Sequence, residues 1–447
     1  MKRYEKYKPS GVDWIDEVPE HWEVTKLRKL GTFSASGIDK KIVEGEPLVQ
    51  IINYVDVYRN STKELREGEY MIVSAPAEKI KEHQVCVGDM IFLPSSETYE
   101  DLGLSAVVMD QLDNTAFSYH VLRFTCSSGI DINYRKYITN NNFCLSYFSS
   151  CGSGTIRKIL SREIFKSCPV FLPPIDEQKT MAAFLDARCA DIDKVVATQE
   201  KRIALLKEMK QSIITQAVTR GLNPDAKIKD SGVEWIGMVP EHWDVMPFKS
   251  KFKTDKGLSI TKADLVDEGV PVISYGQIHS KQNDYVHTLD HLLRFIPEEL
   301  IPTDSKAKLE IGDVVFADTS EDVEGSGNAF YIEREGVYAG YHTVIAKSIE
   351  RVDNRYFAYL FATPIWRSQV RSQVYGVKVY SITQQILKAT SLIVPPPEEQ
   401  KQIVEVLEEK CARIDRQIDN IQNEIELLRE YKQSLITDVV TGKVKVC

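Results

Sequence analysis

Histidines and clustered acids are the residues of this chain whose types suit chemistry best. His21 and His242 each stand in the sequence PEHW, and neither has the partner spacing of a metal site or a catalytic pair. The acidic cluster TSEDVE, from Thr319 to Glu324, carries oxygen atoms of the kind that hold hard cations. We interpret the histidines as structural and the acidic cluster as a solvated loop.

Motifs for catalysis and for nucleotide binding are absent from the sequence. There is no G-x-x-x-x-G-K-[ST] phosphate loop, because TGKVK at 441–445 lacks both the spacing and the hydroxyl. There is also no G-x-G-x-x-G after a strand, no Asn/Asp-Pro-Pro-aromatic signature of an amino-methyltransferase and no H-E-x-x-H. None of the eight cysteines forms a C-x-x-C pair, which argues against a zinc site or a disulfide framework. These absences favour a binding or adaptor protein over an enzyme.

Composition places the chain among ordinary globular proteins. It has 447 residues, of which 43% are hydrophobic and 27% charged, enough for two to four cores. No apolar run approaches a membrane span, and the polar start MKRYEKYKPSG has no signal-peptide core, so we expect a cytoplasmic protein. The net charge of −9 argues against a broad basic coat, so contact with nucleic acid requires local patches or a basic partner.

The sequence segments that are expected to position any site occur twice along the chain. SGVDWIDEVPEHW at 10–22 returns as SGVEWIGMVPEHW at 231–243, and LPPIDEQK from Leu172 returns as VPPPEEQK from Val394. LLKEMKQSIIT from Leu205 and LLREYKQSLIT from Leu427 repeat with the same spacing as Leu172 and Val394, which we call the repeat offset. The segments between these anchors match weakly. The chain therefore has two halves with similar ends and different middles, which is typical of a shared scaffold with two different binding parts.

Two long segments without Gly or Pro, 175–220 and 398–441, are predicted to be helices. Apolar residues recur every seven positions in both, and each member has a counterpart at the repeat offset, with Lys210 and Lys432 as matching polar members. This pattern favours a coiled coil over an ordinary amphipathic helix, and the two helices are expected to pair antiparallel over about 60 Å. The predicted seam consists of Leu185, Cys189, Ile192, Val196, Gln199, Ile203, Leu206, Lys210, Ile213 and Ala217, then Leu407, Cys411, Ile414, Ile418, Ile421, Ile425, Leu428, Lys432, Leu435 and Val439.

The middle segments read as mixed α/β structure. Short β-like runs such as 46–58 and 270–278 are followed by aromatic helical segments at 133–150 and 354–374. The predicted fold class is mixed α/β, with two globular domains joined by two long antiparallel coiled-coil helices in a pseudo-twofold repeat. The predicted boundaries are 1–174 for the first domain with its head, 175–220 for the first helix, 221–394 for the second domain, and 395–447 for the second helix and tail.

In this arrangement the chain resembles the specificity subunit of type I restriction-modification systems. The resemblance rests on LPPIDEQK and VPPPEEQK, each opening a long helix, on both SGV-x-WI…VPEHW heads, and on the GD-hydrophobic strands of the middles. It covers essentially the whole chain.

The resemblance implies a non-catalytic DNA-binding subunit. Each target recognition domain would read one half of a split double-stranded DNA site, and the helices would set the spacing and dock two methyltransferase subunits. Two restriction subunits, which are motor-nucleases, would complete the complex. S-adenosylmethionine, ATP and magnesium would belong to those partners, so no cofactor and no metal is expected on this chain.

The family motifs do not identify the residues that contact DNA, because these contact residues differ from one member of the family to another. Polar loops after the GD strands and before the helices are predicted to supply them, since Arg and Lys suit phosphates or guanine and Ser, Thr and Tyr suit backbone or base edges. The candidates are Ser95, Ser96, Thr98, Tyr99, Thr155, Arg157 and Lys158 in the first half, and Thr319, Ser320, Asp322, Lys378, Tyr380 and Ser381 in the second.

Two other functions stay open at this point. One is a coiled-coil scaffold that joins two proteins without reading DNA, which the acidic balance favours slightly. The other is an enzyme with an unfamiliar site, which the missing motifs disfavour.

Overall fold

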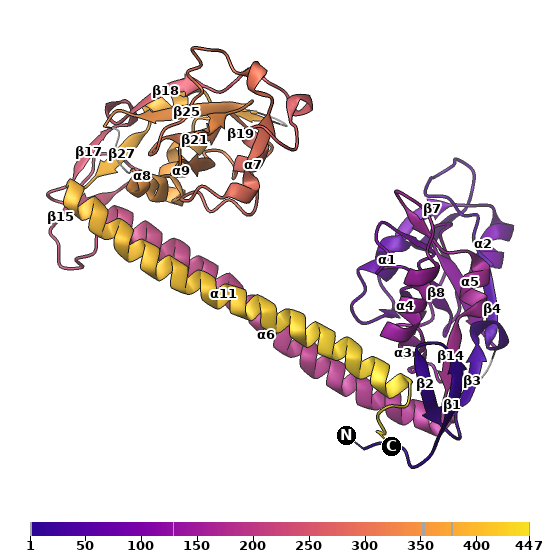
Figure 1. Cartoon of the computed structure of the whole chain (residues 1–447). Coiled ribbons are helices and arrows are strands. Elements are labelled where there is room, and N and C mark those ends of the chain that lie inside the picture. Colours follow the sequence, from indigo (N-terminus) through magenta and orange to yellow (C-terminus); the bar gives the residue numbers. More distant parts are fainter. Residues whose placement is uncertain (1, 128, 351–353, 377–378, 447) are drawn as a thin grey trace. The chain divides into compact units, whose positions relative to one another are not determined.

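The computed structural model describes residues 2–127, 129–350, 354–376 and 379–446. The chain divides into two compact units. Unit 1 comprises Met1–Glu200 with Gln422–Cys447, and unit 2 comprises Lys201–Ile421. The two long helices α6 (Ile175–Arg220) and α11 (Pro397–Val440) each contribute to both units (Figure 1). Within the described residues, no helix is long and apolar enough to cross a membrane.

Unit 1 combines a short hairpin, small sheets and helices. Its largest sheet has the order β4-β12-β8-β10-β6, and a three-stranded sheet has the order β11-β5-β7. Its strands are β1 (Tyr7–Val12), β2 (Ile15–Pro19), β3 (Glu23–Lys26), β4 (Gly31–Ala35), β5 (Leu48–Ile52), β6 (Glu64–Leu65), β7 (Met71–Ser74), β8 (Met90–Phe92), β9 (Ser95–Ser96), β10 (Ser105–Val108), β11 (Thr115–Phe117), β12 (Leu122–Cys126), β13 (Lys158–Ile159) and β14 (Pro169–Leu172). Its short helices are α1 (Tyr54–Tyr58), α2 (Ala77–His83), α3 (Arg135–Ile138), α4 (Asn142–Cys151) and α5 (Arg162–Ser167).

Unit 2 repeats this plan with its own strand pairings. Its largest sheet has the order β18-β25-β21-β23, and a three-stranded sheet has the order β20-β19-β24. The strands are β15 (Ile228–Asp230), β16 (Met238–Pro240), β17 (Asp244–Pro247), β18 (Phe252–Lys256), β19 (Val270–Ile273), β20 (Arg294–Ile296), β21 (Val314–Ala317), β22 (Thr319–Ser320), β23 (Ala329–Tyr331), β24 (Tyr338–Ala339), β25 (Thr343–Ser348), β26 (Tyr380–Ser381) and β27 (Ser391–Val394). The short helices are α7 (Tyr275–Ile278), α8 (Arg355–Phe361), α9 (Pro364–Arg371) and α10 (Gln384–Ala389). The mixed α/β class is confirmed.

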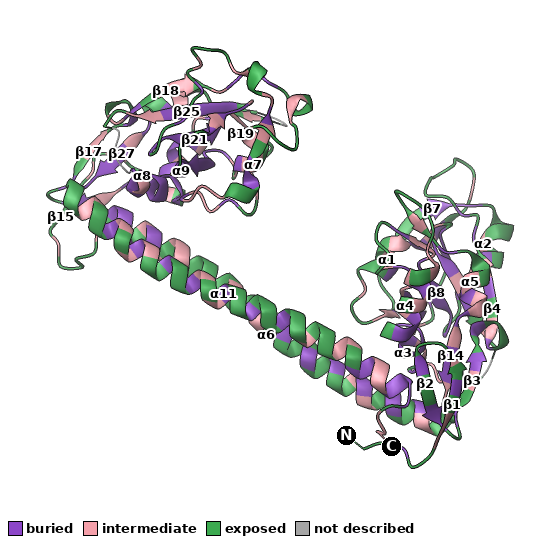
Figure 2. Ribbon diagram, viewed as in Figure 1, coloured by how far each residue is buried: buried purple, intermediate pink, exposed green. Residues whose placement is uncertain are grey.

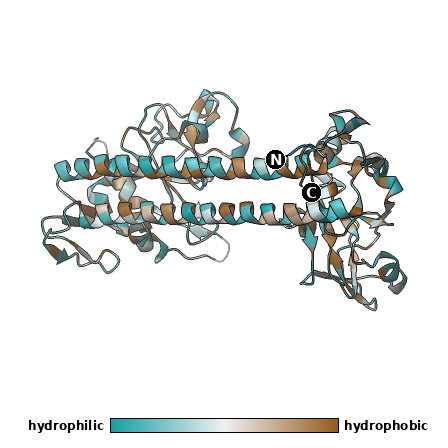
Figure 3. Ribbon diagram, turned by 90° about the horizontal axis from the view of Figure 1, so that it is seen from below, coloured by the Kyte–Doolittle hydropathy of each residue, from teal (hydrophilic) through white to brown (hydrophobic). Residues whose placement is uncertain are grey.

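The cores lie between the sheets and the helices of each unit, where Figure 2 shows most buried residues. Strands such as β8, β10, β21 and β23 are buried along their whole length, which suits apolar segments covered on both faces. Figure 3 shows hydrophobic and hydrophilic positions alternating along the long helices. Every member of the predicted heptad seam is buried or half-buried, so the coiled-coil interpretation is confirmed.

The pairing of α6 with α11 is antiparallel in each unit. In unit 1, Lys432 Nζ binds Asp193 at 2.7 Å, and in unit 2 Lys210 Nζ binds Asp415 at 2.6 Å. The two pairs are counterparts at the repeat offset, so the polar members of the seam form the same interhelical ion pair twice. Such polar contacts favour one register and one orientation of the helices over the alternatives.

Two β-like runs of the sequence contain a helix that the pattern did not predict. The strands end at Ile52 and Ile273, and α1 and α7 begin two residues later. Asn53 and Ser274 each form a capping box with the side chain at the third helical position. The caps satisfy backbone N–H groups that an extended chain would leave without partners, which outweighs the β-propensity of the segment. The aromatic helical segments likewise divide into two helices each, α3 with α4 and α8 with α9.

Candidate nucleic-acid interface

The repeated PEHW and EQ motifs bind each other at the start of each long helix. In unit 1, Glu177 accepts hydrogen bonds from Trp22 Nε1 at 3.1 Å and from His21 Nε2 at 2.5 Å. In unit 2, Glu399 accepts from Trp243 Nε1 at 3.0 Å and contacts His242 Nε2 at 2.8 Å. Both indole rings are fully buried. The histidines are therefore structural, as predicted, and we call this contact the helix joint.

The glutamine of each EQ motif ties down neighbouring backbone. Gln178 Nε2 donates to the carbonyls of Gly129 and Pro173, and its Oε1 accepts from the Asp131 N–H at 2.8 Å. Gln400 Nε2 donates to the Pro395 carbonyl at 2.8 Å. These hydrogen bonds join the globular part of each unit to the start of its long helix. They therefore fix the position of the globular part relative to the helix start.

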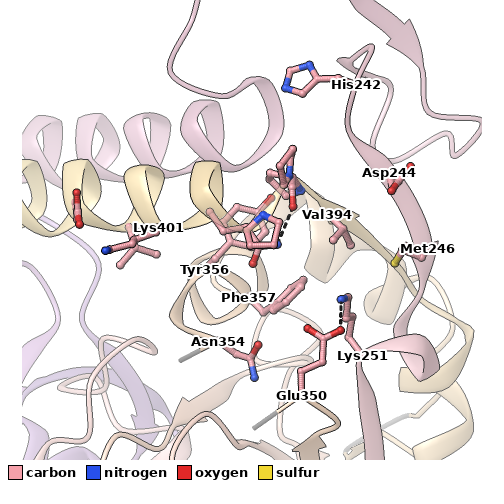
Figure 4. A pocket seen from close by; sticks show the side chains of 16 residues that line it. His242, Asp244, Met246, Lys251, Glu350, Asn354, Tyr356, Phe357, Val394 and Lys401 are labelled. Carbon is pink, nitrogen blue, oxygen red and sulfur yellow. Dashed lines mark hydrogen bonds and ion pairs between the residues drawn. The ribbon is translucent and has the colours of Figure 1, made fainter. Parts of the chain in front are cut away.

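A cavity of about 760 Å³ in unit 2 lies at this joint. Figure 4 shows His242 at its edge, the ion pair of Lys251 and Glu350 on one wall, and Lys401 on α11. None of the predicted contact residues lines it. The cavity therefore belongs to the scaffold, and the predicted contact residues lie elsewhere.

In unit 1 the pairing of β9 with β13 brings two predicted loops together. Arg157 Nε donates to Ser95 Oγ at 3.0 Å, and its guanidinium lies 5.5 Å from the centre of the Tyr54 ring. Ser96 is buried, and its hydroxyl accepts from Tyr54 at 3.4 Å. Arg157 itself is exposed. The loop thus presents a cation whose position is set by a serine and a tyrosine.

The neighbouring predicted residues support the same loop. Lys158 Nζ lies 4.6 Å from the centre of the Tyr99 ring and donates to the carbonyl oxygens of Gly154 and Thr155. Thr98 Oγ1 donates to an Asp101 carboxylate oxygen at 2.7 Å. All seven candidates of the first half therefore lie in the paired strands β9 and β13 or in the loops beside them.

A cavity of about 380 Å³ opens between this loop and α1. Its lining adds residues that the sequence interpretation missed, among them stacked Tyr54 and Tyr58, whose ring centres are 5.4 Å apart. Burial, with Lys40 and Arg157 nearby, lowers the pKa of His120 in the same lining. The capped aromatic segment YVDVY was the signal that could have found the tyrosines. The full lining is Lys40, Tyr54, Val55, Tyr58, Arg59, Ser96, Glu97, Thr98, Asp101, His120 and Arg157.

Unit 2 builds the same arrangement from different side chains. Thr319 and Ser320 of β22 pair with Ser381 and Tyr380 of β26, and Ser320 is buried like Ser96. Asp322 is exposed, and its Oδ1 accepts from the Gly325 N–H at 2.6 Å. The remaining candidate of this half, Lys378, lies outside the described residues.

Aromatic and histidine rings replace the tyrosine pair in unit 2. Tyr275 lies within 6.1 Å, centre to centre, of the rings of His279, Tyr341 and His342. His279 Nε2 donates to the Thr319 carbonyl at 2.8 Å, and His342 Nδ1 contacts Asp318 Oδ1 at 3.2 Å. These rings were also missed, because only the fold brings them to the β22 loop.

The two loops differ most in charge. At Lys158 of β13 and at the preceding Arg157, the register of β26 places Tyr380 and the preceding Val379 in unit 2. Among the described residues, unit 1 therefore offers cations at its strand pair, whereas unit 2 offers neutral hydroxyls, imidazoles and carboxylates. Two strand pairs with the same backbone arrangement and different side chains can each bind a different surface of the same class of ligand.

Comparison with known proteins finds a matching family model and similar sequences. Residues 240–427 match the model described as "Type I restriction modification DNA specificity domain". A putative type I restriction enzyme specificity subunit of Methanocaldococcus jannaschii, MjaX, is 24% identical over 97% of this chain and 96% of its own length. The MjaVIII specificity subunit of the same organism is 24% identical over 67% of this chain and 68% of its own.

The fold agrees with these sequence matches. A chain from the study titled "Structural basis underlying complex assembly and conformational transition of the type I R-M system" shares the fold with a TM-score of 0.68, at 13% identity, over 96% of this chain and 99% of that one. The chain is therefore similar over almost its whole length to type I restriction-modification specificity subunits, and residues 240–427 match their DNA specificity domain, as the repeated motifs indicated.

Proposed function

We propose that this chain is the DNA specificity subunit of a type I restriction-modification complex and that each unit reads one half of a split target. One observation carries the proposal: strand pairs β9–β13 and β22–β26 have the same pairing and present different side chains. Base sequence is read by such polar side chains on base edges, while cations hold the backbone. Two different loops on one repeated scaffold suit two different half-sites.

The long helices support docking of two copies of one partner. In unit 2, Leu205 and Met209 of α6 are 65% and 53% exposed, and in unit 1 Leu427 and Tyr431 of α11 are 65% and 53% exposed. These positions are counterparts at the repeat offset. Exposed apolar pairs of this kind favour protein contacts. Two methyltransferase subunits would bind there, and two restriction subunits would complete the complex. On this proposal the chain has no catalytic role, and S-adenosylmethionine, ATP and magnesium bind to the partner subunits.

Replacing Arg157 and Lys158 together by alanine is expected to weaken DNA binding by the complex with its methyltransferase. Each lost contact between a cationic side chain and a phosphate makes the slope of log affinity against log salt concentration smaller by about 0.9. The slope should therefore become smaller by about 1–2 when both side chains are removed. Binding titrations on DNA carrying the target, at several salt concentrations, measure both affinity and slope.

The matched control replaces Arg28 and Lys29, two exposed residues of unit 1 with the same total charge, by alanine. The control should keep both affinity and slope. If the Arg157/Lys158 variant also keeps both, the loop of unit 1 does not hold DNA. If the unmodified complex does not bind DNA at all, the coiled-coil scaffold without DNA reading becomes the better account.

A further inference from the structure

Two arginines on α9 of unit 2 have unused hydrogen-bond donors. Arg367 is only 8% exposed, its Nε donates to the Phe361 carbonyl at 3.1 Å, and its guanidinium lies 4.3 Å from the centre of the Tyr285 ring. Its Nη2 is buried without a partner, and so is the Nε of Arg371. Among the described residues, no carboxylate forms an ion pair with either arginine. A buried guanidinium without a counter-charge is costly, so this position favours an anion.

The loop after β22 packs directly on these arginines. Gly327, in the left-handed region at φ +89°, would place an added Cβ 3.5 Å from Arg367 Cγ and 3.6 Å from the Trp366 ring. Ser326 beside it is fully buried, and its hydroxyl has no partner within the described chain. Arg371 Nη2 donates to the carbonyl of Glu324 in the same loop. The loop therefore contacts both arginines, at the Arg367 side-chain stem and at the Arg371 guanidinium, where it rests on α9.

The backbone beneath Arg367 is held in an uncommon conformation. Tyr285 has φ +71°, although it is not glycine, and its N–H donates to Asn283 Oδ1 at 3.0 Å. The Asn283 amide in turn donates to the carbonyls of Ile278 and Ala329. Strain of this kind persists only where the surrounding structure enforces it, and it often marks a functional position. Here it places an aromatic ring against the buried guanidinium.

Unit 1 has no such cations at the corresponding place. The repeat offset matches Arg367 and Arg371 with Leu145 and Ser149 of α4, and buried Leu102 stands beside Gly103 where unit 2 has Ser326 beside Gly327. Unit 1 instead carries Arg157 and Lys158 just before and at the start of β13, where unit 2 has Val379 and Tyr380. Lys378 of unit 2 lies outside the described residues. Among the described residues, the positive charge of the two loops thus lies on different elements.

We propose that Arg367 and Arg371 form a phosphate-binding site at the base of the β22 loop, which takes one backbone phosphate of the DNA read by unit 2. The proposal rests on the proposed function. A guanidinium presents paired N–H donors that match phosphate oxygens, and Arg367 Nη2 and Arg371 Nε have such donors without a partner among the described residues. The site gives unit 2 a backbone contact that the described residues of its strand pair do not offer.

The test measures DNA binding by the complex with its methyltransferase across a salt series. Arg371→Gln removes the cation on the more exposed side of the site, and Arg367→Met removes the buried one. Each folded variant is expected to bind about 10-fold more weakly, with a salt slope smaller by about 0.9. Arg334→Ala is the matched control, because Arg334 is an exposed arginine of the same unit paired with Asp290. It should leave affinity and slope unchanged.

Arg371→Gln keeps the test decisive if Arg367→Met does not fold. An unchanged slope and affinity in Arg371→Gln, with the unmodified complex binding normally, would overturn the phosphate site and leave the proposed function standing. Failure of the unmodified complex to bind DNA would instead contradict the proposed function.

An experiment with inorganic phosphate distinguishes a site for a DNA backbone phosphate from a site for free phosphate. Thermal unfolding of the complex is followed in phosphate and in chloride at equal ionic strength. A phosphate-dependent rise of Tm that Arg371→Gln abolishes, together with the reduced DNA slope, supports the site. The same rise of Tm with an unchanged DNA slope shows a site for free phosphate and overturns the assignment to DNA.

Discussion

Replacing Trp243 by alanine is expected to lower the free energy of unfolding of unit 2 by about 3–5 kcal/mol. The ring is fully buried, its Nε1 donates to Glu399 at 3.0 Å, and it lies beside Gly221 at the end of α6. Removing it opens a cavity and takes the indole donor from a half-buried carboxylate, which keeps its contact with His242. The loss is therefore larger than that for an average core position.

Peptide-resolved hydrogen exchange of the full chain measures this loss, because it reports on each unit separately. Amides of unit 2 should lose protection while those of unit 1 keep theirs, and Trp22→Ala should give the reverse. Trp235→Ala is the matched control, since that ring is 46% exposed in the same unit. Equal effects of Trp243→Ala and Trp235→Ala would show that the helix joint does not hold the unit together.

The stability of unit 2 is expected to fall by about 2–3 kcal/mol as the pH rises from about 7 to beyond 10. His287 lies between Asp284 at 2.6 Å and Glu408 of α11 at 3.1 Å, and these hydrogen bonds raise its pKa to about 10. Since the folded pKa lies above the ordinary 6.5, the stabilisation is complete below 6.5 and disappears as the pH passes about 10.

The groups around His287 determine how the stability of unit 2 changes at acid pH. Burial is the largest single influence on the pKa of Asp284 and Glu408 and raises it, but the hydrogen bonds and charge of His287, together with their other donors, outweigh burial and lower the pKa of both carboxyls. Their contribution is therefore lost at acid pH. Arg355, 3.5 Å from Glu408, stays charged throughout, and Tyr359 donates to the same carboxylate at 2.9 Å.

Urea unfolding between pH 6 and 10.5 measures the effect, with His287→Gln as the variant that should lose the alkaline decline. Unit 1 provides an internal comparison, because Lys136 binds the corresponding Asp186 at 2.6 Å and its pKa is raised. The unfolding free energy of unit 1, obtained from hydrogen exchange after correction for the intrinsic rise of amide exchange with pH, should stay constant over this range. An alkaline decline that persists in His287→Gln would assign it to another group.

The scaffold was predictable because its signals are local and repeated. The heptads predicted α6 and α11, and the duplicated Lys210 and Lys432 marked polar seam positions. What Lys210 and Lys432 bind was not predictable, since each partner lies on the other helix, in the opposite half of the sequence. The same holds for Glu177 and Trp22: both motifs were visible in the sequence, but their contact is tertiary.

The candidate interface was predictable only in outline. The loops after the GD strands were identified, and β9–β13 and β22–β26 place them opposite the second predicted loops. The tyrosines of α1 and the rings of α7 were missed, because β-propensity hid a capped helix. Arg367 gave no sequence signal either, since an arginine in an amphipathic helix normally faces solvent, and only packing by the β22 loop buries it.

A methylome tests the central claim most directly. The chain is expressed with its neighbouring methyltransferase in a host without adenine methylation, and modified adenines are mapped by long-read sequencing. Two matching loops with unlike side chains predict a split motif: two short, different blocks around a fixed unspecified gap. One short unsplit motif would contradict two reading units, and no methylation, with the same methyltransferase active beside another specificity chain, would contradict DNA reading by this chain.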